Sequence, residues 1–392
     1  MPIFSNNNDH SARRGGRSGP SVNIGISGSY GGLNLGDEAI LKAIVAQIRE
    51  SMDAKITVYT RDTEDTLRRH DVDHAVPVRE ISRDEARAEI EQHDGFVLGG
   101  GGIFYDRDVK TYLREVALAH EAGVPVMIYA VSAGPLEDMQ ARQLVRKHLN
   151  RVKVVTVRDR QGRAVFEDAG VDREIAVTAD PALLLHPETL PEDALLREGI
   201  DPSTRLVGFS VREPGPAAPD MDVDHYHALL AHAADFMVDR LQAQIVFIPM
   251  ERKKMDVQHS HAVVSRMDCA KNAVVLKNDY SPGELISLIQ HFEFSVGMRL
   301  HFLIFSALAG VPFVALPYAA KVTGLLEDLE MEMPPLTEVN SGRLIATIDR
   351  SWDMRAQVRK RIRRLLPGLQ ERARHNHSLL DQMLSSVPEH AN

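Results

Sequence analysis

Residues 22–48 read VNIGISGSYGGLNLGDEAILKAIVAQI, which is a β-branched run followed by a glycine-rich loop and a helical pattern. The opening run is typical of a buried strand. In the helical pattern Ile40, Ile44 and Ile48 recur at four-residue spacing with Leu41 beside them, so one face is apolar. A strand, a loop and an amphipathic helix in this order predict the first βα unit of a parallel sheet.

The same alternation continues along the chain in two series. Strand-like runs of the first series are KITVYT, GFVLGG, VPVMIYAV, VKVVTV and EIAVTAD, and those of the second are LVGFSVRE, AQIVFIPM, NAVVLKN, EFSVGM and VPFVALPY. Around residues 186–205 the apolar periodicity lapses and proline recurs, as in a linker. We therefore expect two similar α/β domains, residues 21–190 and 203–350, that face a central cleft where the carboxyl ends of the strands converge.

The composition of the 392 residues limits the classes of function. The most apolar stretch, FLIFSALAGVPFVALPY, is interrupted by glycine and proline, which argues against a membrane-spanning helix. A single cysteine and an N-terminus without a signal-peptide pattern lead us to expect a cytoplasmic protein. The net charge of −9 argues against nucleic acid as the main partner, so any anion site must be local.

The two ends of the chain differ from the α/β series. Residues 1–20 are rich in Asn, Ser, Arg and Gly and are expected to form a disordered tail. Residues 352–392 predict a basic helical tail, whose apolar stripe comprises Val358, Ile362, Leu365 and Leu366. The stripe favours packing on the protein, and the alternative is contact of the arginines with an anionic membrane surface or lipid carrier.

Two glycine-rich segments follow predicted strands. The first, GSYGGLNLGDE, lacks the spacing of the dinucleotide fingerprint and the lysine of a P-loop, which argues against both nucleotide classes. Its Asn34 and Asp37 either cap the following helix or contact a ligand. The second, GGGGIFYD, contains Gly101 and Asp106; either a substrate lies across the bare backbone, or the glycines form a tight turn into a helix.

Basic side chains also follow predicted strands. Arg158 and Arg212 each stand beside an acidic residue, so each either binds an anionic ligand or pairs with that neighbour. The segment GMRLH places Arg299 two residues before His301, and Lys321 follows the next strand. A histidine titrates near neutral pH, and the surrounding cations favour a functional role for it over a structural one. The histidines show no convincing metal-ligand spacing, and we expect no metal.

Taken in order, these segments resemble the polysaccharide pyruvyl transferase family. The residues that carry the resemblance are GGLNLGDEAIL, GGGGIFYD, VRDRQGRAVFEDAGV, TADPALLL and GMRLHFLIFSALAGVPFVALPYAAKV, which follow the family's order from about residue 22 to 330. The resemblance implies two Rossmann-like domains in a GT-B-like arrangement. It also implies a reaction in which phosphoenolpyruvate donates a pyruvate ketal to two hydroxyls of a sugar, with no further cofactor.

The resemblance further implies roles for individual residues. His301 would be the acid/base group, and Arg212, Arg299 and Lys321 would bind the donor. The acceptor or cleft residues would be Asn34, Asp37, Gly101, Asp106 and Arg158. Two departures from the family pattern, Ala319-Ala320 and the turn at Ser132, affect the expected acceptor geometry more than the reaction.

The expected partners are phosphoenolpyruvate and a saccharide acceptor that is free, nucleotide-linked or lipid-linked, the last with peripheral contact at the inner face of the cytoplasmic membrane. Two alternatives stay open at this point. One is a GT-B glycosyltransferase that uses a nucleotide sugar, since the fold and cleft would be the same. The other is a sugar-binding protein without catalysis, which would explain a cleft but not its cations.

Overall fold

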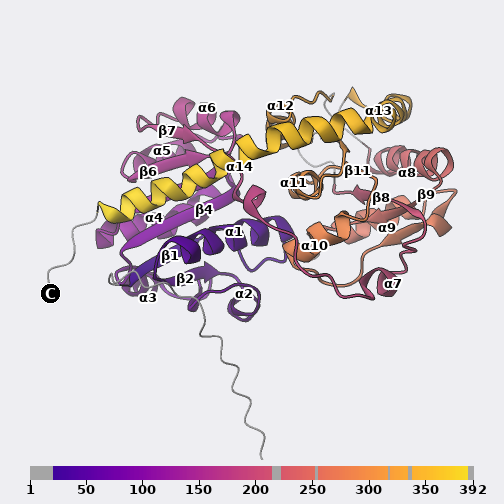
Figure 1. The fold of residues 1–392 in the computed structure, drawn as a ribbon. Coiled ribbons are helices and arrows are strands. Elements are labelled where there is room, and N and C mark those ends of the chain that lie inside the picture. The colour runs from indigo at the N-terminus through magenta and orange to yellow at the C-terminus, as the bar shows by residue number, and fades with distance from the viewer. Residues whose placement is uncertain (1–20, 214–221, 252–254, 317, 334–337, 387–392) are drawn as a thin grey trace, which may run out of the picture.

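The computed structural model describes residues 21–213, 222–251, 255–316, 318–333 and 338–386. The tail expected at residues 1–20 lies outside these ranges. The described chain forms two parallel sheets with helices on both faces (Figure 1), which confirms the predicted α/β class and its two Rossmann-like units.

The first sheet has seven strands in the order β3-β2-β1-β4-β5-β6-β7, all parallel. Its strands are β1 (Val22–Ser27), β2 (Ala54–Thr60), β3 (His74–Pro77), β4 (Gly95–Phe104), β5 (Val126–Ala133), β6 (Val154–Val157) and β7 (Ile175–Val177). The associated helices are α1 (Leu35–Ser51), α2 (Thr63–Arg69), α3 (Arg83–Ile90), α4 (Val109–Ala122), α5 (Met139–Leu149) and α6 (Arg160–Asp168). Six of these strands coincide with predicted runs, and the short β3 was not predicted.

The second sheet has five parallel strands in the order β10-β9-β8-β11-β12. These are β8 (Arg205–Ser210), β9 (Ala243–Phe247), β10 (Ala273–Val275), β11 (Phe294–Gly297) and β12 (Phe313–Ala315), each of which overlaps a predicted run. The helices here are α8 (Val223–Leu241), α9 (Asp256–Val264), α10 (Pro282–Ile289), α11 (Leu300–Leu308), α12 (Ala320–Asp328) and α13 (Ser341–Asp353). The short helices η1 (Pro181–Leu184) and α7 (Ala194–Glu198) lie between the two sheets in sequence, and η3 (Ala270–Asn272) precedes β10.

Helix α1 packs on the first sheet through the predicted stripe, since Ile40, Leu41, Ile44 and Ile48 are all fully buried. The close packing explains the run of glycines in β4. A Cβ on Gly100 would come within 2.0 Å of Cγ2 of Ile40. The sequence placed the four glycines 99–102 after the end of this strand, and that expectation is wrong. Strand β4 continues through all four of them, with a register shift against β5.

Helix α14 (Arg355–Ser385) joins the two domains, as Figure 1 shows, by running along both of them. It contacts α11 and α13 in the second domain and η1, β5 and β6 in the first. The predicted stripe packs on the protein as expected, with Ile362 fully buried and Val358, Leu365 and Leu366 partly buried against the core. None of the described helices is long and apolar enough to cross a membrane.

The polar anchor of α14 in the first domain is Asn376, which is fully buried. Its Oδ1 accepts hydrogen bonds from Oγ1 of Thr156 at 2.6 Å and from Oγ1 of Thr178 at 2.8 Å. Its Nδ2 donates to the carbonyl of Ala179 at 3.2 Å. A buried amide that is satisfied in this way fixes the register of the helix on strands β6 and β7.

We predict that Asn376→Ala lowers the free energy of unfolding by roughly 2 kcal/mol, because it leaves buried hydroxyls and a carbonyl without their partner. Thermal and urea unfolding would measure the loss. Ser378→Ala, an exposed position two residues further on the same helix, is the matched control and should change stability by less than about 0.5 kcal/mol. Equal stabilities of the two variants would contradict the role of Asn376.

Candidate active site

A small cavity lies between the two domains at the N-termini of α1, α11 and α12. It is lined by Asn34, Asp37, Gly102, Arg158, Met250, Arg299, Leu300, His301, Tyr318 and Lys321. The structure thus brings together six of the nine residues singled out from the sequence. Three helix N-termini beside one cavity favour an anion, because the positive end of each helix dipole lies there.

His301 stands in the first turn of α11 and faces the buried carboxylate of Asp180, with Nε2 at 3.4 Å from Oδ2. The imidazole fits here because residue 36 is glycine; a Cβ at Gly36 would come within 2.0 Å of Nδ1. Nε2 is buried and has no hydrogen-bond partner in this conformation. A small shift would let it donate to Asp180, an arrangement that orients a catalytic histidine.

Asp180 was not singled out from the sequence, although it lies in the quoted segment TADPALLL. It is the N-cap of η1, where its Oδ1 accepts from the backbone N–H of Ala182 at 2.9 Å. Its Oδ2 accepts from Nη1 of Arg158 at 2.6 Å. Burial opposes ionisation, but His301 and Arg158 outweigh it and hold the pKa of Asp180 well below its usual range. Arg158 therefore pairs mainly with Asp180, rather than with the adjacent Asp159 at 4.0 Å.

The three predicted donor-binding cations surround one aromatic residue, Tyr318, which is buried. The guanidinium carbon of Arg212 lies 4.3 Å from the centre of the Tyr318 ring, and Nζ of Lys321 lies 5.6 Å from it. Burial raises the pKa of the Tyr318 hydroxyl, but the opposing effect of Lys321, Arg212 and Arg299 is larger. The net result is a pKa of about 8, below the usual value for tyrosine. The cations are thus close enough to act on a single group.

Two of these cations are also paired with carboxylates. Nε of Arg299 donates to Asp256 at 2.9 Å and its Nη2 donates to Glu251 at 3.0 Å. Burial disfavours the charge of Arg299, but these partners raise the pKa of Arg299. Arg212 pairs with the neighbouring Glu213, as the alternative based on adjacent acids predicted. Both arginines therefore lie at the site with part of their charge already balanced.

Asn34 and Asp37 combine the two roles that the sequence left open. Asn34 is the N-cap of α1, where its Oδ1 accepts from the backbone N–H of Gly36 at 3.0 Å and its Nδ2 donates to Asp37 at 3.0 Å. Both residues also line the cavity. Burial raises the pKa of Asp37 above its usual range, against the opposing effects of His301 and Lys321. A carboxyl group whose ionised form is disfavoured is a suitable proton acceptor near neutral pH.

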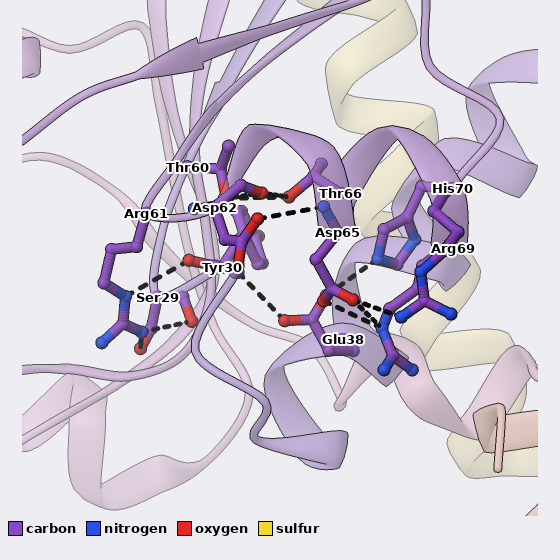
Figure 2. A network of polar contacts seen from close by, with 12 residues as sticks. Ser29, Tyr30, Glu38, Thr60, Arg61, Asp62, Asp65, Thr66, Arg69 and His70 are labelled. Atoms are coloured by element: carbon purple, nitrogen blue, oxygen red, sulfur yellow. Dashed lines mark hydrogen bonds and ion pairs between the residues drawn. The ribbon is translucent and has the colours of Figure 1, made fainter. Parts of the chain in front are cut away.

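The adjacent Glu38 has a structural role, which Figure 2 shows. Its Oε1 accepts from the backbone N–H of Gly31 at 3.0 Å, and its Oε2 lies 2.8 Å from Nε2 of His70. Arg61 fixes the other side of the same loop by donating to the carbonyl of Ser29 at 2.7 Å. Charged and polar contacts thus fix the loop before α1, and the Asp37 side chain lines the cavity.

Three predicted residues do not line the cavity: Arg212, which lies over the ring of Tyr318, and the two residues Gly101 and Asp106. Gly101, with a φ of 82°, lies behind Asp37, and a Cβ there would come 3.1 Å from Oδ1 of Asp37. Asp106 accepts hydrogen bonds from the backbone N–H groups of Glu137 and Asp138, at 3.0 and 3.1 Å, and so orders that loop. Gly102 is the glycine of the run that lines the cavity.

The domains are in contact around this site. The backbone N–H of Leu35 donates to the carbonyl of Met250 at 2.9 Å, and Asn34 forms an isolated β-bridge with Glu251. The free space is about 30 Å³, which is about one water molecule, so a larger ligand requires the surrounding groups to separate. A wider cavity of about 300 Å³ lies on the other side of the loop, lined by Leu33, Leu35, Glu38, Arg69, Lys277 and Asp279.

Comparison with known proteins gives one family for most of the chain. The model of the family described as polysaccharide pyruvyl transferase matches residues 34–319. Among curated proteins, the amylovoran biosynthesis protein AmsJ of Erwinia amylovora is 23% identical over 310 residues, which cover 76% of this chain and 74% of the relative. The matched range contains the candidate residues described above except Lys321, which lies two residues beyond its end.

Solved structures share the fold at low sequence identity. The S. aureus MnaA–UDP complex has a TM-score of 0.63 and 10% identity, and covers 95% of this chain and 100% of its own. The UDP-GlcNAc 2-epimerase of Neisseria meningitidis bound to UDP-GlcNAc has a TM-score of 0.60 and 8% identity, with 92% and 99% covered. These likenesses support the two-domain, GT-B-like arrangement of the fold.

Two carboxylates, Asp37 in the cavity lining and Asp180 beside His301, should have opposite effects on stability. Because the folded protein raises the pKa of Asp37, ionised Asp37 lowers stability as the pH rises through that pKa. We predict that Asp37→Asn raises the thermal unfolding temperature at pH 7 and that the gain disappears below about pH 3, where the aspartate is protonated in both states.

Asp180→Asn is the matched comparison at the same site. The lowered pKa of Asp180 means that its ionised form stabilises the fold, and its removal leaves Arg158 buried and unpaired. The loss at pH 7 should be about 3 to 5 kcal/mol. A loss of stability in both variants at pH 7 would contradict the distinction drawn between the two carboxylates.

Proposed function

The chain belongs to the polysaccharide pyruvyl transferase family, and from this premise we propose that it moves a pyruvate ketal from phosphoenolpyruvate onto two hydroxyls of a sugar in the biosynthesis of an exopolysaccharide or cell-surface glycan. The observation that carries the proposal is that His301, Arg299 and Lys321 line one interdomain cavity together with Tyr318, on whose ring Arg212 lies. Phosphoenolpyruvate has a carboxylate and a phosphate on a small frame, so it suits several cations placed around one proton donor.

The second domain provides the groups for the donor. Arg212 and Lys321 lie on the side of Tyr318, and Arg299 begins the helix that carries His301. The N-termini of α11 and α12 add positive potential without adding net charge. This local potential allows an anion to bind although the whole chain has a charge of −9.

In the proposed reaction His301 gives a proton to the methylene carbon of phosphoenolpyruvate. The adjacent carbon becomes cationic, and the ionised Asp180 stabilises the imidazolium before the transfer. A sugar hydroxyl then adds to the cationic carbon, and Asp37 takes its proton, in keeping with the raised pKa of that carboxyl group. Loss of phosphate and attack by the second hydroxyl close the ketal.

The first domain provides the groups for the acceptor. Asn34 and Asp37 can pair with sugar hydroxyls, and Gly102 leaves bare backbone beside them. The wider cavity next to Leu33 and Leu35 offers space for the remainder of an acceptor, whether it is free, nucleotide-linked or lipid-linked. Closure around both substrates would keep water from the cationic carbon, which would otherwise be hydrolysed.

The direct test is phosphate release from phosphoenolpyruvate with a panel of galactosides, glucosides, mannosides and N-acetylhexosamines. We predict that one acceptor class triggers release and that His301→Gln reduces the rate by about 100-fold or more. In a thermal-shift assay, phosphoenolpyruvate should stabilise the wild type. Stabilisation by a nucleotide sugar together with no response to phosphoenolpyruvate would favour a glycosyltransferase and contradict the proposal.

Donor binding should depend on Arg212. We predict that Arg212→Ala weakens phosphoenolpyruvate binding by about 2 kcal/mol, or about 30-fold, measured by calorimetry. This variant is preferred to one at Arg299, because Arg299 also binds the buried carboxylates of Asp256 and Glu251. Arg240→Ala, which removes surface ion pairs with Asp349 and Asp353, is the matched control and should bind the donor like the wild type.

A further inference from the structure

Tyr318 lines the cavity, and the proposed reaction has not yet used its ionisable side chain. It follows β12, lies just before α12, and is buried at the boundary between the domains. The guanidinium carbon of Arg212 lies over its ring, 4.3 Å from the ring centre, and Nζ of Lys321 lies 5.6 Å from that centre. Its side chain therefore lies among the cations on which donor binding would depend.

The charged groups that face Tyr318 come from every element around it. Arg212 follows β8, Arg299 begins α11 and Lys321 lies in α12; all three favour the phenolate. The carboxylates of Glu213, Asp256 and Glu251 balance part of the arginine charge. His301 and Asp37 lie across the cavity. A phenol in these surroundings can release and regain a proton near neutral pH, unlike an exposed tyrosine.

The proton count of ketal formation leaves a task for such a group. Two hydroxyl protons leave the sugar, one ends on the new methyl group, and the other leaves with the phosphate. Asp37 and His301 account for the first transfer, since the proton taken by Asp37 replaces the one that His301 gives up. The second transfer, from the second hydroxyl to the phosphate, needs another carrier.

We propose that Tyr318 is this carrier: its hydroxyl protonates the bridging oxygen of the departing phosphate, and its phenolate then takes the proton of the second sugar hydroxyl. This role rests on the proposed function. In the step, the carbon–oxygen bond to phosphate breaks, its electron pair goes to the phosphate oxygen, and that oxygen gains the phenol proton. The second hydroxyl then bonds to the same carbon, and its proton restores the phenol, so the balance closes without another reactant.

The same cations would hold either the phenolate or the donor phosphate, so the two negative charges compete. An anion bound at the site should therefore raise the pKa of Tyr318 from about 8. By linkage, anion affinity should fall as the pH rises above this value. This competition ensures that Tyr318 holds its proton when a phosphate is bound, which is the state in which the proposed step begins.

The first experiment measures ionisation of Tyr318 without catalysis. Tyrosinate absorbance is followed from pH 6 to 10 in the wild type, in Tyr318→Phe and in Tyr280→Phe. We expect a transition near pH 8 that Tyr318→Phe lacks and that Tyr280→Phe retains, because contact with Glu198 and burial raise the pKa of Tyr280 to about 12. Inorganic phosphate should move the transition to higher pH. A wild-type transition that phosphate leaves unmoved would overturn the proposed competition.

The second experiment separates the two proton transfers in deuterated water, with phosphoenolpyruvate and the saccharide that supports phosphate release. Tyr318→Phe should lower release by about 100-fold or more while deuterium still enters the methylene group of recovered phosphoenolpyruvate. His301→Gln should lose both signals. Circular dichroism and melting of Tyr318→Phe would establish that it folds.

The outcomes of this experiment separate the two hypotheses. Release by folded Tyr318→Phe within about threefold of the wild type would overturn the role of Tyr318 and leave the proposed function intact. If folded Tyr318→Phe loses both deuterium entry and phosphate release, Tyr318 acts in donor binding, and its role as proton carrier is overturned. A wild type that shows neither signal with any saccharide would overturn the proposed function itself.

Discussion

The buried carboxylate of Asp180 is the group on which the rest of the site depends, because it joins the two domains by charge. It follows β7 in the first domain, binds Arg158 of that domain at 2.6 Å and faces His301 of the second domain at 3.4 Å. A buried carboxylate is stable only when cations are close to it. The position of α11, and therefore of the histidine it carries, is coupled to a charge on the opposite domain.

The cations of the cleft differ in their surroundings, and the net charge of the chain does not indicate this difference. Arg299 is held by Asp256 and Glu251, so it fixes the start of α11 while it contributes to the potential. Lys321 and Arg212 lie at Tyr318, where ionisable protons and bound anions respond to the same field. An acidic protein can thus have a local positive potential, because burial makes these few local charges act more strongly than distant exposed ones.

The sequence predicted the parts of the fold that depend on local periodicity. The apolar stripe of α1 and eleven of the twelve strands were found in this way, whereas β3 escaped because it has four residues and ends in proline. Distant contacts were harder to predict. The pairing of Asp180 with His301 spans two domains, and Tyr318 beside proline resembles a core aromatic residue. The glycines of β4 were misassigned because the close approach of Ile40 cannot be inferred from spacing.

The contacts between the domains also decide how a substrate can reach the chemistry. Apolar and buried polar contacts of α14 hold both domains along one side. Along the glycine loop they meet through the Leu35–Met250 hydrogen bond, the bridge at Asn34 and the ion pair of Arg69 with Asp279. Hydrogen bonds and partly exposed ion pairs of this kind each contribute about 1 kcal/mol, much less than a buried helix face. Separation for ligand entry therefore costs least on the loop side, where Asn34 and Asp37 would receive the acceptor, and closure on that side completes the cavity.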